Sequence, residues 1–423
     1  MVKRASQKIA SIPPQSKTST SPGEGKNAGL SVAKNAKNDE FYTKWIDIER
    51  EMNAYLEFDL DVFRDKVILL PCDDPEWSNF AKFFALHFMD YGIKKLISTS
   101  YAPNSKPPEI PYQPTLFESE APHFDAAKTR ANGKKFVLEA EDINEDGAVN
   151  IEDLQWEYLD GDGDFRSDEV IALRDEADIV ITNPPFSLFR EFLAWILEGN
   201  KKFVILGNMN AITYKEVFPL IQTDRIWLGQ SIHSGDREFE VPPAIDTRSK
   251  SLRIDESGKR FIRVDGIRWF TNIDHGRRHQ PLQLMTMADN RKFSKHKEII
   301  GVGYQKYDNY DAIEVPFTEA IPSDYKGVMG VPISFLSKYN SEQFEILGAT
   351  QRGCHDAVPD TKKYDNYKEM RPDGTPTGSK GGKTNENANL SGNDGKKNYF
   401  INDDGHIVQS TYQRIFVRIK RKL

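Results

Sequence analysis

Short apolar runs alternate with helical patterns along the first part of the folded sequence. The runs occupy residues 67–70, 95–98, 135–138, 178–182 and 202–206. Their apolar residues follow one another directly, as in strands that are buried on both faces of a sheet. Helical periodicity over 79–90 and 187–198 separates members of this series. Strands that alternate with helices predict an α/β fold with a parallel, doubly wound sheet.

The pattern becomes less regular toward the C-terminus. Two apolar segments, 226–228 and 267–271, are candidates for the last strands of the sheet. Residues 351–398 are rich in Gly, Asn, Lys, Asp and Pro, which predicts long loops or a mobile lobe. Segment 415–419 indicates one further strand with a basic end.

The N-terminal segment differs from the rest in composition. Residues 1–38 contain seven Lys or Arg, one Glu and few large apolar side chains. Such a segment cannot bury enough surface to offset its chain entropy, so we expect it to be disordered. The predicted organisation is a basic tail over 1–38, an α/β domain over 39–275 and a second region over 276–423.

Composition restricts the class of protein. The chain has 423 residues, of which 38% are apolar and 29% are charged. This is typical of a soluble globular protein, and the apolar runs are far shorter than a membrane span. No signal-peptide stretch follows the N-terminus, and Cys72 and Cys354 are the only cysteines. We therefore expect a cytoplasmic protein with no membrane partner.

The net charge of −7 is distributed unevenly. Residues 139–178 hold sixteen acidic residues against two Arg, whereas 201–300 hold eighteen Lys or Arg against twelve acidic residues. The last ten residues add five more basic groups. Basic segments of this kind favour a nucleic-acid partner, although solvated surfaces give the same pattern.

One motif indicates a specific chemistry. Asn183, Pro184, Pro185 and Phe186 directly follow the apolar run 178–182 and precede a helical pattern. In doubly wound sheets, ligands bind at the carboxyl ends of the strands. The Asn183 side-chain oxygen and the Pro184 carbonyl can each accept one N–H of an exocyclic amine, which turns its lone pair toward a methyl donor. The prolines fix the backbone, and Phe186 can stack on a flat base. The simpler alternative is a proline-rich turn between a strand and a helix.

Residues 177–191, which contain this motif, resemble the EcoRI-type adenine-specific DNA methyltransferase family. Further similar stretches are 71–80, 163–168, 268–272, 329–336 and 339–348. The resemblance implies a class I methyltransferase fold with a C-terminal DNA target-recognition region at 276–423. It also implies methyl transfer from S-adenosylmethionine to the N6 amine of adenine in double-stranded DNA, after base flipping. A cognate restriction endonuclease is a candidate partner.

The same resemblance indicates residues that would bind the cofactor. Asp73, Asp74 and Pro75 follow the run 67–70, in the place of the family's first cofactor motif. No Gly-x-Gly follows this run, unlike most cofactor loops of the fold. Asp164 and Phe165 resemble a further motif, whose carboxylate binds the adenine amine of the cofactor while the aromatic ring packs on the adenine. Asp164 could equally be one more residue of an acidic loop.

A calcium-loop pattern overlaps the acidic segment. Asp142, Asn144, Asp146, Asn150 and Asp153 occupy ligand positions 1, 3, 5, 9 and 12 of an EF-hand-like loop, with Gly at position 6. No clear helical pattern precedes the loop, and position 12 is Asp rather than Glu. The pattern predicts either a structural Ca²⁺ site or a solvated acidic turn.

Alternative functions remain open at this stage. Methylation of N4 of cytosine uses a similar geometry, but its motif more often begins with Ser. Glutamine methylation in proteins also uses Asn-Pro-Pro, usually followed by Tyr. A calcium-dependent interaction module around 142–168 would not be an enzyme. The basic loop 275–279 could contact phosphates or be a solvated loop.

Overall fold

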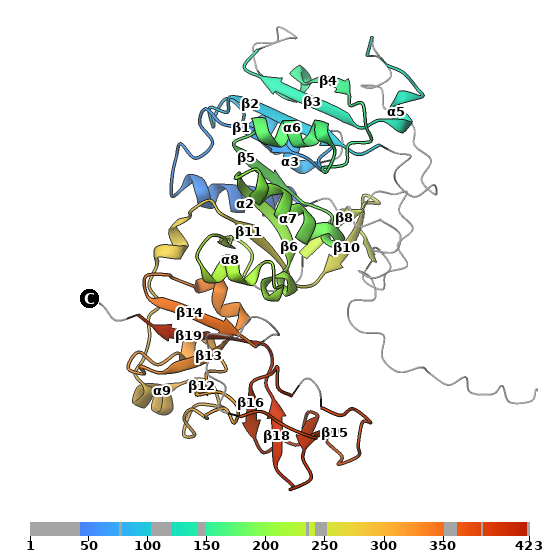
Figure 1. Cartoon of the computed structure of the whole chain (residues 1–423). Coiled ribbons are helices and arrows are strands. Elements are labelled where there is room, and N and C mark those ends of the chain that lie inside the picture. The colour runs from blue at the N-terminus through green and yellow to red at the C-terminus, as the bar shows by residue number, and fades with distance from the viewer. Residues whose placement is uncertain are drawn as a thin grey trace, which may run out of the picture.

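A computed structural model describes residues 43–75, 78–102, 121–122, 124–141, 149–233, 237–241, 252–350, 362–381 and 384–420. The tail predicted at 1–38 lies outside these residues. Among the described residues, the largest sheet has eight strands in the order β4-β3-β2-β1-β5-β6-β11-β7 (Figure 1). The strands are β1 (Val67–Leu70), β2 (Lys95–Ser100), β3 (Lys134–Glu139), β4 (Gln155–Tyr158), β5 (Ile179–Thr182), β6 (Lys202–Asn208), β7 (Trp227–Leu228) and β11 (Ile267–Thr271).

Only the centre of this sheet is parallel. Strand β1 pairs in parallel with β2 and β5, and β5 pairs in parallel with β6. At one edge β3 and β4 are antiparallel, and at the other β11 is antiparallel to both β6 and β7. The parallel sheet that the sequence predicts is therefore present at the centre, whereas both edges are antiparallel. Parallel neighbours need a crossover connection, whereas β3 and β4 form a meander.

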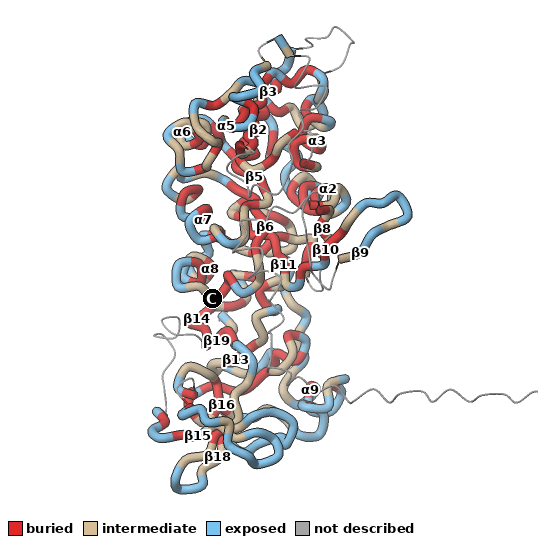
Figure 2. Tube along the Cα trace, turned by 90° about the vertical axis from the view of Figure 1, so that its right-hand side faces the viewer, coloured by how far each residue is buried: buried red, intermediate tan, exposed pale blue. Residues whose placement is uncertain are grey.

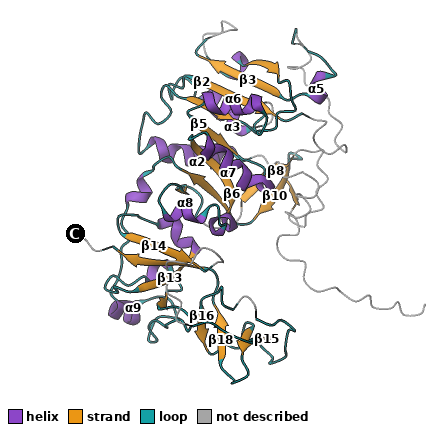
Figure 3. Ribbon diagram, in the orientation of Figure 1, coloured by secondary structure: helices purple, strands orange, loops and turns teal. Residues whose placement is uncertain are grey.

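Helices cover both faces of the sheet (Figure 3). Successive strand residues point to opposite faces, so Ile68 and Leu70 pack with α2 (Trp45–Leu56) and α3 (Asn79–Leu86). Val67 and Leu69 belong to the opposite core, together with residues of α6 (Asp168–Glu176), α7 (Phe189–Glu198) and α8 (Phe218–Gln222). Buried positions run through the centre of the resulting three layers (Figure 2).

A second sheet is built from the C-terminal region. Its order is β12-β13-β19-β14, from β12 (Ala312–Glu314), β13 (Val328–Pro332), β14 (Phe344–Ala349) and β19 (Arg414–Ile419). Ile346 and Val417 of this sheet belong to the same hydrophobic core as Phe218 and Ile221 of α8. The core is therefore continuous between the two sheets. The division at 275 and 276 stays a prediction.

A small antiparallel sheet overlaps the segment for which loops were expected, with two strands inside residues 351–398 and two beyond them. It consists of β15 (Lys368–Met370), β16 (Asn389–Ser391), β17 (Tyr399–Ile401) and β18 (Ile407–Ser410), in the order β15-β17-β18-β16. Gly374 and Gly392 have positive φ angles of 83° and 86°, as glycines of tight turns do. Strands of three or four residues have too few alternating positions to be recognised in a Gly-rich sequence.

Two further features complete the description. A three-stranded sheet, β8 (Arg237–Val241), β9 (Leu252–Ile254) and β10 (Arg260–Val264), was not anticipated from the sequence. Within the described part of the chain, no helix is both long and apolar enough to span a membrane.

Candidate active site

The carboxyl ends of the central parallel strands meet at one edge of the sheet. Strand β1 leads by way of α3 to β2 on one side, whereas β5 and β6 lie on its other side. Strand order therefore reverses between β1 and β5, which is where doubly wound sheets bind ligands. Asp73 follows β1 and Asn183 follows β5, so the fold brings these two predicted site residues to the same edge.

Asp73 joins three segments at this edge. Its side chain is buried, and its carboxylate accepts hydrogen bonds of 2.6 Å from Ser78 Oγ and 2.6 Å from Thr182 Oγ1. Its backbone N–H donates to Thr99 O, in β2, at 3.1 Å. The Asp73 carboxylate therefore fixes the β1 loop against α3 and β5. Ser78 is also the N-cap of α3, where its hydroxyl accepts the N–H of Phe80 at 3.0 Å.

The next two residues of this loop lie in the same turn. The Asp74 carbonyl accepts the Ser78 N–H at 2.7 Å, and Pro75 is buried. The loop is thus closed by backbone and side-chain hydrogen bonds rather than by glycines. A cofactor role for Asp73, Asp74 and Pro75 stays a prediction.

The segment before Asp164 is attached to the end of β2. The N–H of Ala102 donates to Asp162 O at 2.8 Å. Gly163 has φ +84° and passes so close to β2 that a Cβ atom there would lie 2.4 Å from Ser100 O. A side chain at this position would separate the two segments, so the glycine permits the contact. The two predicted groups of cofactor residues therefore converge on the carboxyl end of β2.

Asp164 and Phe165 have different surroundings. The Asp164 carboxylate forms an ion pair of 2.6 Å with Arg166 and keeps 22% of its side-chain surface exposed. Phe165 is only 5% exposed, and its ring packs edge-on against Phe192 and Trp195 of α7 at centroid distances of 5.1 and 5.7 Å. The Asp164 carboxylate is thus partly exposed, whereas the Phe165 ring is buried against α7. Their contacts with a cofactor stay predictions.

The Asn183 loop connects β5 to α7 through the 3₁₀ turn Phe186–Leu188. The Pro185 carbonyl accepts the Leu188 N–H at 2.9 Å and so begins this turn. No described residue donates a hydrogen bond to the Pro184 carbonyl. Phe186 is partly buried, and its ring lies edge-on to Phe239 of β8, 6.3 Å between centroids. The unexpected three-stranded sheet therefore flanks the motif.

The calcium-loop residues are only partly described. Asp142, Asn144 and Asp146 lie outside the described residues. Asn150 Oδ1 accepts the Glu152 N–H at 2.8 Å, and Asp153 Oδ2 accepts the Asn150 N–H at 2.9 Å. Both oxygens thus stabilise the turn over residues 150–153. In the described parts of the chain, no three His, Cys, Asp or Glu side chains are grouped to hold a metal ion.

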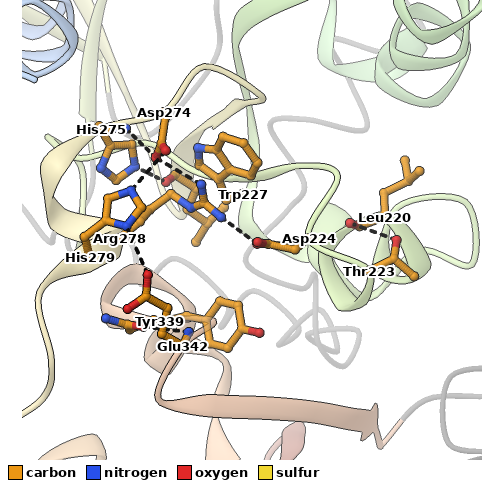
Figure 4. A network of polar contacts seen from close by, with 12 residues as sticks. Leu220, Thr223, Asp224, Trp227, Asp274, His275, Arg278, His279, Tyr339 and Glu342 are labelled. Carbon is orange, nitrogen blue, oxygen red and sulfur yellow. Dashed lines mark hydrogen bonds and ion pairs between the residues drawn. The ribbon is translucent and has the colours of Figure 1, made fainter. Parts of the chain in front are cut away.

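The basic loop 275–279 is an ordered contact between segments (Figure 4). Arg278 lies over the ring of Trp227, 3.4 Å from its centroid, and pairs with Asp224 at 2.6 Å and Asp274 at 3.0 Å. His279 pairs with Asp274 at 3.0 Å. Two carboxylates and an indole ring therefore hold Arg278 in place, whereas His279 is exposed.

His275 and Arg414 also have structural partners. His275 is buried beside Leu228 O, 3.0 Å from Nε2, and burial lowers its pKa to about 4. Arg414, in the basic C-terminal strand, forms a buried ion pair of 2.6 Å with Glu314. Neither side chain is available as a surface contact for phosphate.

Sequence reasoning missed the residues that support the site. Thr182 was assigned only as the end of a strand, and Ser78 was not singled out. Ser78 precedes an apolar helical pattern, which is the usual signal of an N-cap. Nothing in the sequence indicates that the Thr182 hydroxyl contacts a carboxylate more than a hundred residues away.

Comparison with known proteins adds independent information. The family model described as adenine-specific methyltransferase EcoRI matches residues 29–420. The type II methyltransferase M.EcoRI of Escherichia coli is 44% identical over 76% of this chain and 89% of its own length. The type II methyltransferase M.MpnI of Mycoplasma pneumoniae is 35% identical over 74% of this chain and 83% of its own. No solved structure matches the chain significantly.

Proposed function

The chain belongs to the EcoRI family of adenine-specific methyltransferases, and from this premise we propose that it methylates N6 of adenine at a specific site in double-stranded DNA. The mixed sheet with helices on both faces is consistent with a class I methyltransferase fold. The observation that carries the proposal is the position of Asn183 and Pro184 at the reversal of strand order, directly after β5.

Asn183 and Pro184 would act on the target amine. The Asn183 side-chain oxygen and the Pro184 carbonyl would each accept one N–H of the adenine amine. This geometry turns the amine lone pair out of conjugation with the ring. That no described residue donates to the Pro184 carbonyl supports this role. Catalysis would then depend on orientation and on fixed acceptors, without a covalent enzyme intermediate.

The target adenine must leave the duplex to reach this edge of the sheet. Phe186 follows the two prolines and is partly exposed, so its ring can stack on the flipped base. Its edge-on contact with Phe239 would hold the ring in a fixed orientation. Pro185 holds the backbone between the acceptors and this ring.

S-adenosylmethionine would bind along the neighbouring part of the edge. The hydrogen bond between Asp73 and Thr182 brings the loop of Asp73, Asp74 and Pro75 next to Asn183. Asp164 lies beside the end of β2, where its partly exposed carboxylate could accept the adenine amine of the cofactor. The bound cofactor supplies an electrophilic methyl group on a sulfonium. The buried Asp73 would act by positioning this loop.

The remaining parts of the chain would bind DNA. We assign residues 39–275 to catalysis and 276–423 to target recognition. Helix α9 (Met287–Phe293) carries exposed Arg291 and Lys292, and Phe293 is 61% exposed beside them. Exposed cations of this kind can neutralise phosphates. We further propose that the protein is cytoplasmic and that a cognate restriction endonuclease is its partner.

Calcium has a minor place in this account. The two described ligand candidates, Asn150 and Asp153, accept backbone N–H groups within their own turn, and Ca²⁺ binding by the loop stays a prediction. Transfer of a methyl group from a sulfonium to an amine needs no Lewis acid. A Ca²⁺ ion at this loop would therefore have a structural role only.

Nucleoside analysis tests the proposal. The protein is incubated with S-adenosylmethionine and unmethylated genomic DNA, and the nucleosides are separated by mass spectrometry. N6-methyldeoxyadenosine is the expected product. N4-methyldeoxycytidine in its place would favour the cytosine alternative. Unmodified DNA, together with methylated glutamine after a parallel incubation with a protein extract, would favour the protein-methylating alternative.

A further inference from the structure

We propose that Glu51 of α2 is a positioning residue for methyl transfer, because it fixes the loop that leads to the three-stranded sheet beside Phe186. This inference rests on the proposed function, since it concerns the ring assigned to stack on the flipped adenine. Glu51 itself lies outside the groups assigned to the cofactor and the base. It acts through the loop 229–231, through β8 and through Phe239.

The Glu51 carboxylate is fully buried, and both of its oxygens accept hydrogen bonds. Oε1 accepts the backbone N–H of Gln230 at 3.0 Å, and Oε2 accepts that of Ser231 at 2.7 Å. Tyr55, one turn further along α2, donates its hydroxyl to Oε1 at 2.7 Å. A buried carboxylate is costly unless donors of this kind surround it. Because each oxygen has its own backbone donor, the side chain fixes the direction of the loop as well as its distance from α2.

The loop passes so close to Glu51 that a side chain would not fit just before the two donors. A Cβ atom at Gly229 would overlap Glu51 Oε1 and would lie 2.6 Å from Cβ of Trp269. The Gly229 N–H donates to Trp269 O at 3.0 Å and so extends the pairing of β7 with β11. The chain therefore leaves the large sheet at a position that β11 and Glu51 fix together.

The same face of α2 also contacts the first residues of β8 (Figure 2). Lys44, the N-cap of α2, pairs with Glu238 at 2.8 Å. Asp47, in the first turn of the helix, lies 3.7 Å from Arg237. Intervals of three and four residues place Lys44, Asp47 and Glu51 on one face of the helix. This face thus holds both the loop after β7 and the start of β8.

Strand β8 connects these contacts to the catalytic motif. Phe239 is 2% exposed and lies opposite Ile262 of β10. Its ring is edge-on to Phe186, with 6.3 Å between the centroids. Phe239 and Ile232, which follows the loop, belong to one hydrophobic core, and Phe186 packs against that core. In a close-packed core, a shift of the loop is therefore transmitted to the ring assigned to stack on the adenine.

Replacing Glu51 by Gln keeps the shape of the side chain but removes one of its two acceptor oxygens. If the amide oxygen takes the place of Oε1, the amide NH₂ faces the Ser231 N–H. In the opposite orientation, the NH₂ faces the Gln230 N–H. Two donors meet in either case, so the loop must shift or leave a buried N–H without an acceptor.

A double-variant cycle tests the inference. Single-turnover methylation rates at saturating DNA and S-adenosylmethionine are compared for the wild type, Glu51→Gln, Phe186→Ala and the double variant. Glu51→Gln should lower the rate about tenfold, as for a weakened base stack, with cofactor affinity unchanged in calorimetric titration. In the Phe186→Ala background the same change should have almost no further effect, because the ring that Glu51 positions is absent.

Arg174→Gln is the matched control. Arg174 is also buried and donates to Trp195 O at 2.8 Å, but it precedes β5 and lies toward the amino ends of the strands. This variant should lose stability in urea unfolding and keep the wild-type methylation rate. Should Glu51→Gln fail to fold, Tyr55→Phe removes one of the three donors to Glu51 and should give the same dependence on Phe186, with a smaller loss of about threefold.

Three results would overturn the inference. Equal slowing by Glu51→Gln with and without the Phe186 ring would show that Glu51 does not act through that ring. A loss of cofactor affinity as large as the loss of rate would mean that Glu51 supports the whole domain. A wild-type rate in Glu51→Gln, with lower stability as in Arg174→Gln, would leave Glu51 a structural role only. Because the wild type still methylates adenine in all three cases, the proposed function stands or fails separately.

Discussion

The carboxylate of Asp73, after β1, accepts a hydrogen bond of 2.6 Å from the hydroxyl of Thr182, the last residue of β5. This contact joins the loop assigned to the cofactor with the loop assigned to the target base. Both atoms are buried with their residues, so solvent does not compete for the bond. A methyl group can pass in line from donor to amine only if these two loops keep a fixed separation.

Replacing Thr182 by Val should uncouple the two loops. The side chain keeps its shape, but Asp73 loses one partner, which should cost about 1–3 kcal/mol of unfolding free energy. Cofactor affinity and methyl transfer should fall together, because Asp73 would no longer be held. Urea unfolding and calorimetric titration of S-adenosylmethionine measure the two effects.

Thr271→Val is the matched control for this change. Thr271 is also fully buried and donates to Phe203 O at 2.7 Å, but it lies at the far end of β11. We expect lower stability in this variant with unchanged cofactor affinity. Equal losses of cofactor affinity in both variants would mean that the contact between Asp73 and Thr182 has no special role.

The exposed cations near α9 should contribute to DNA affinity through counterion release. Replacing Arg291, Lys292 and Lys295 by Ala should reduce the slope of log affinity against log salt by about 0.9 for each phosphate that the variant no longer neutralises. Fluorescence anisotropy at several salt concentrations gives the slope. An unchanged slope in the triple variant would place the DNA elsewhere on the protein. Arg414 is excluded from this set because of its buried pair with Glu314.

His275 should make the fold sensitive to acid. Burial lowers its pKa to about 4, so the folded protein favours the neutral ring, with Asp274, Arg277 and Arg278 as the charged groups that act on it. The contribution of the buried neutral His275 to the free energy of unfolding is complete above about pH 6.5, the pKa of the ring in the unfolded chain. This contribution is lost as the pH falls toward 4. Between pH 7 and pH 5, the wild type should therefore lose about 2 kcal/mol more than His275→Gln. If urea unfolding shows that the wild type and His275→Gln lose the same free energy of unfolding between pH 7 and pH 5, burial of His275 does not lower its pKa.

Removal of divalent metal should leave methyl transfer intact. Direct transfer needs no Lewis acid, so the rate in a Ca²⁺ chelator should equal the rate in added Ca²⁺. If the loop does bind Ca²⁺, chelation should lower the melting temperature, and Asp146→Ala should reproduce this effect without the chelator. Loss of activity in the chelator, restored by Ca²⁺, would assign the ion a catalytic role that this account does not include.

The sequence predicted the centre of the fold more closely than its edges. Strand β1 has the bounds that its apolar run indicates, and β5 begins one residue after the start of its run, because buried central strands are apolar on successive residues. Strands β8 to β10 were missed, since several of their positions are polar and exposed. The antiparallel direction of β3 depends on a connection that apolar patterns do not reveal.

The candidate site shows the same limit. The sequence indicates Asn183 because its motif follows an apolar strand, at the kind of strand end where ligands bind, and the family resemblance indicates Asp73. It could not indicate that Thr182 holds Asp73, or that Arg277 and Arg278 have different partners. These relationships arise from contacts between segments far apart in the chain. Such contacts can be identified only from the three-dimensional arrangement of the strands.

The role of Asn183 is tested most simply by the rate at which Asn183→Ala forms N6-methyladenine. The protein, S-adenosylmethionine and duplex DNA are combined, and the methylated nucleoside is quantified by mass spectrometry. We expect a rate lower by about 100-fold or more, with cofactor affinity nearly unchanged, because the Asn183 oxygen acts on the target amine rather than on the cofactor. A rate close to that of the wild type would contradict the assignment of Asn183 as the acceptor that activates adenine.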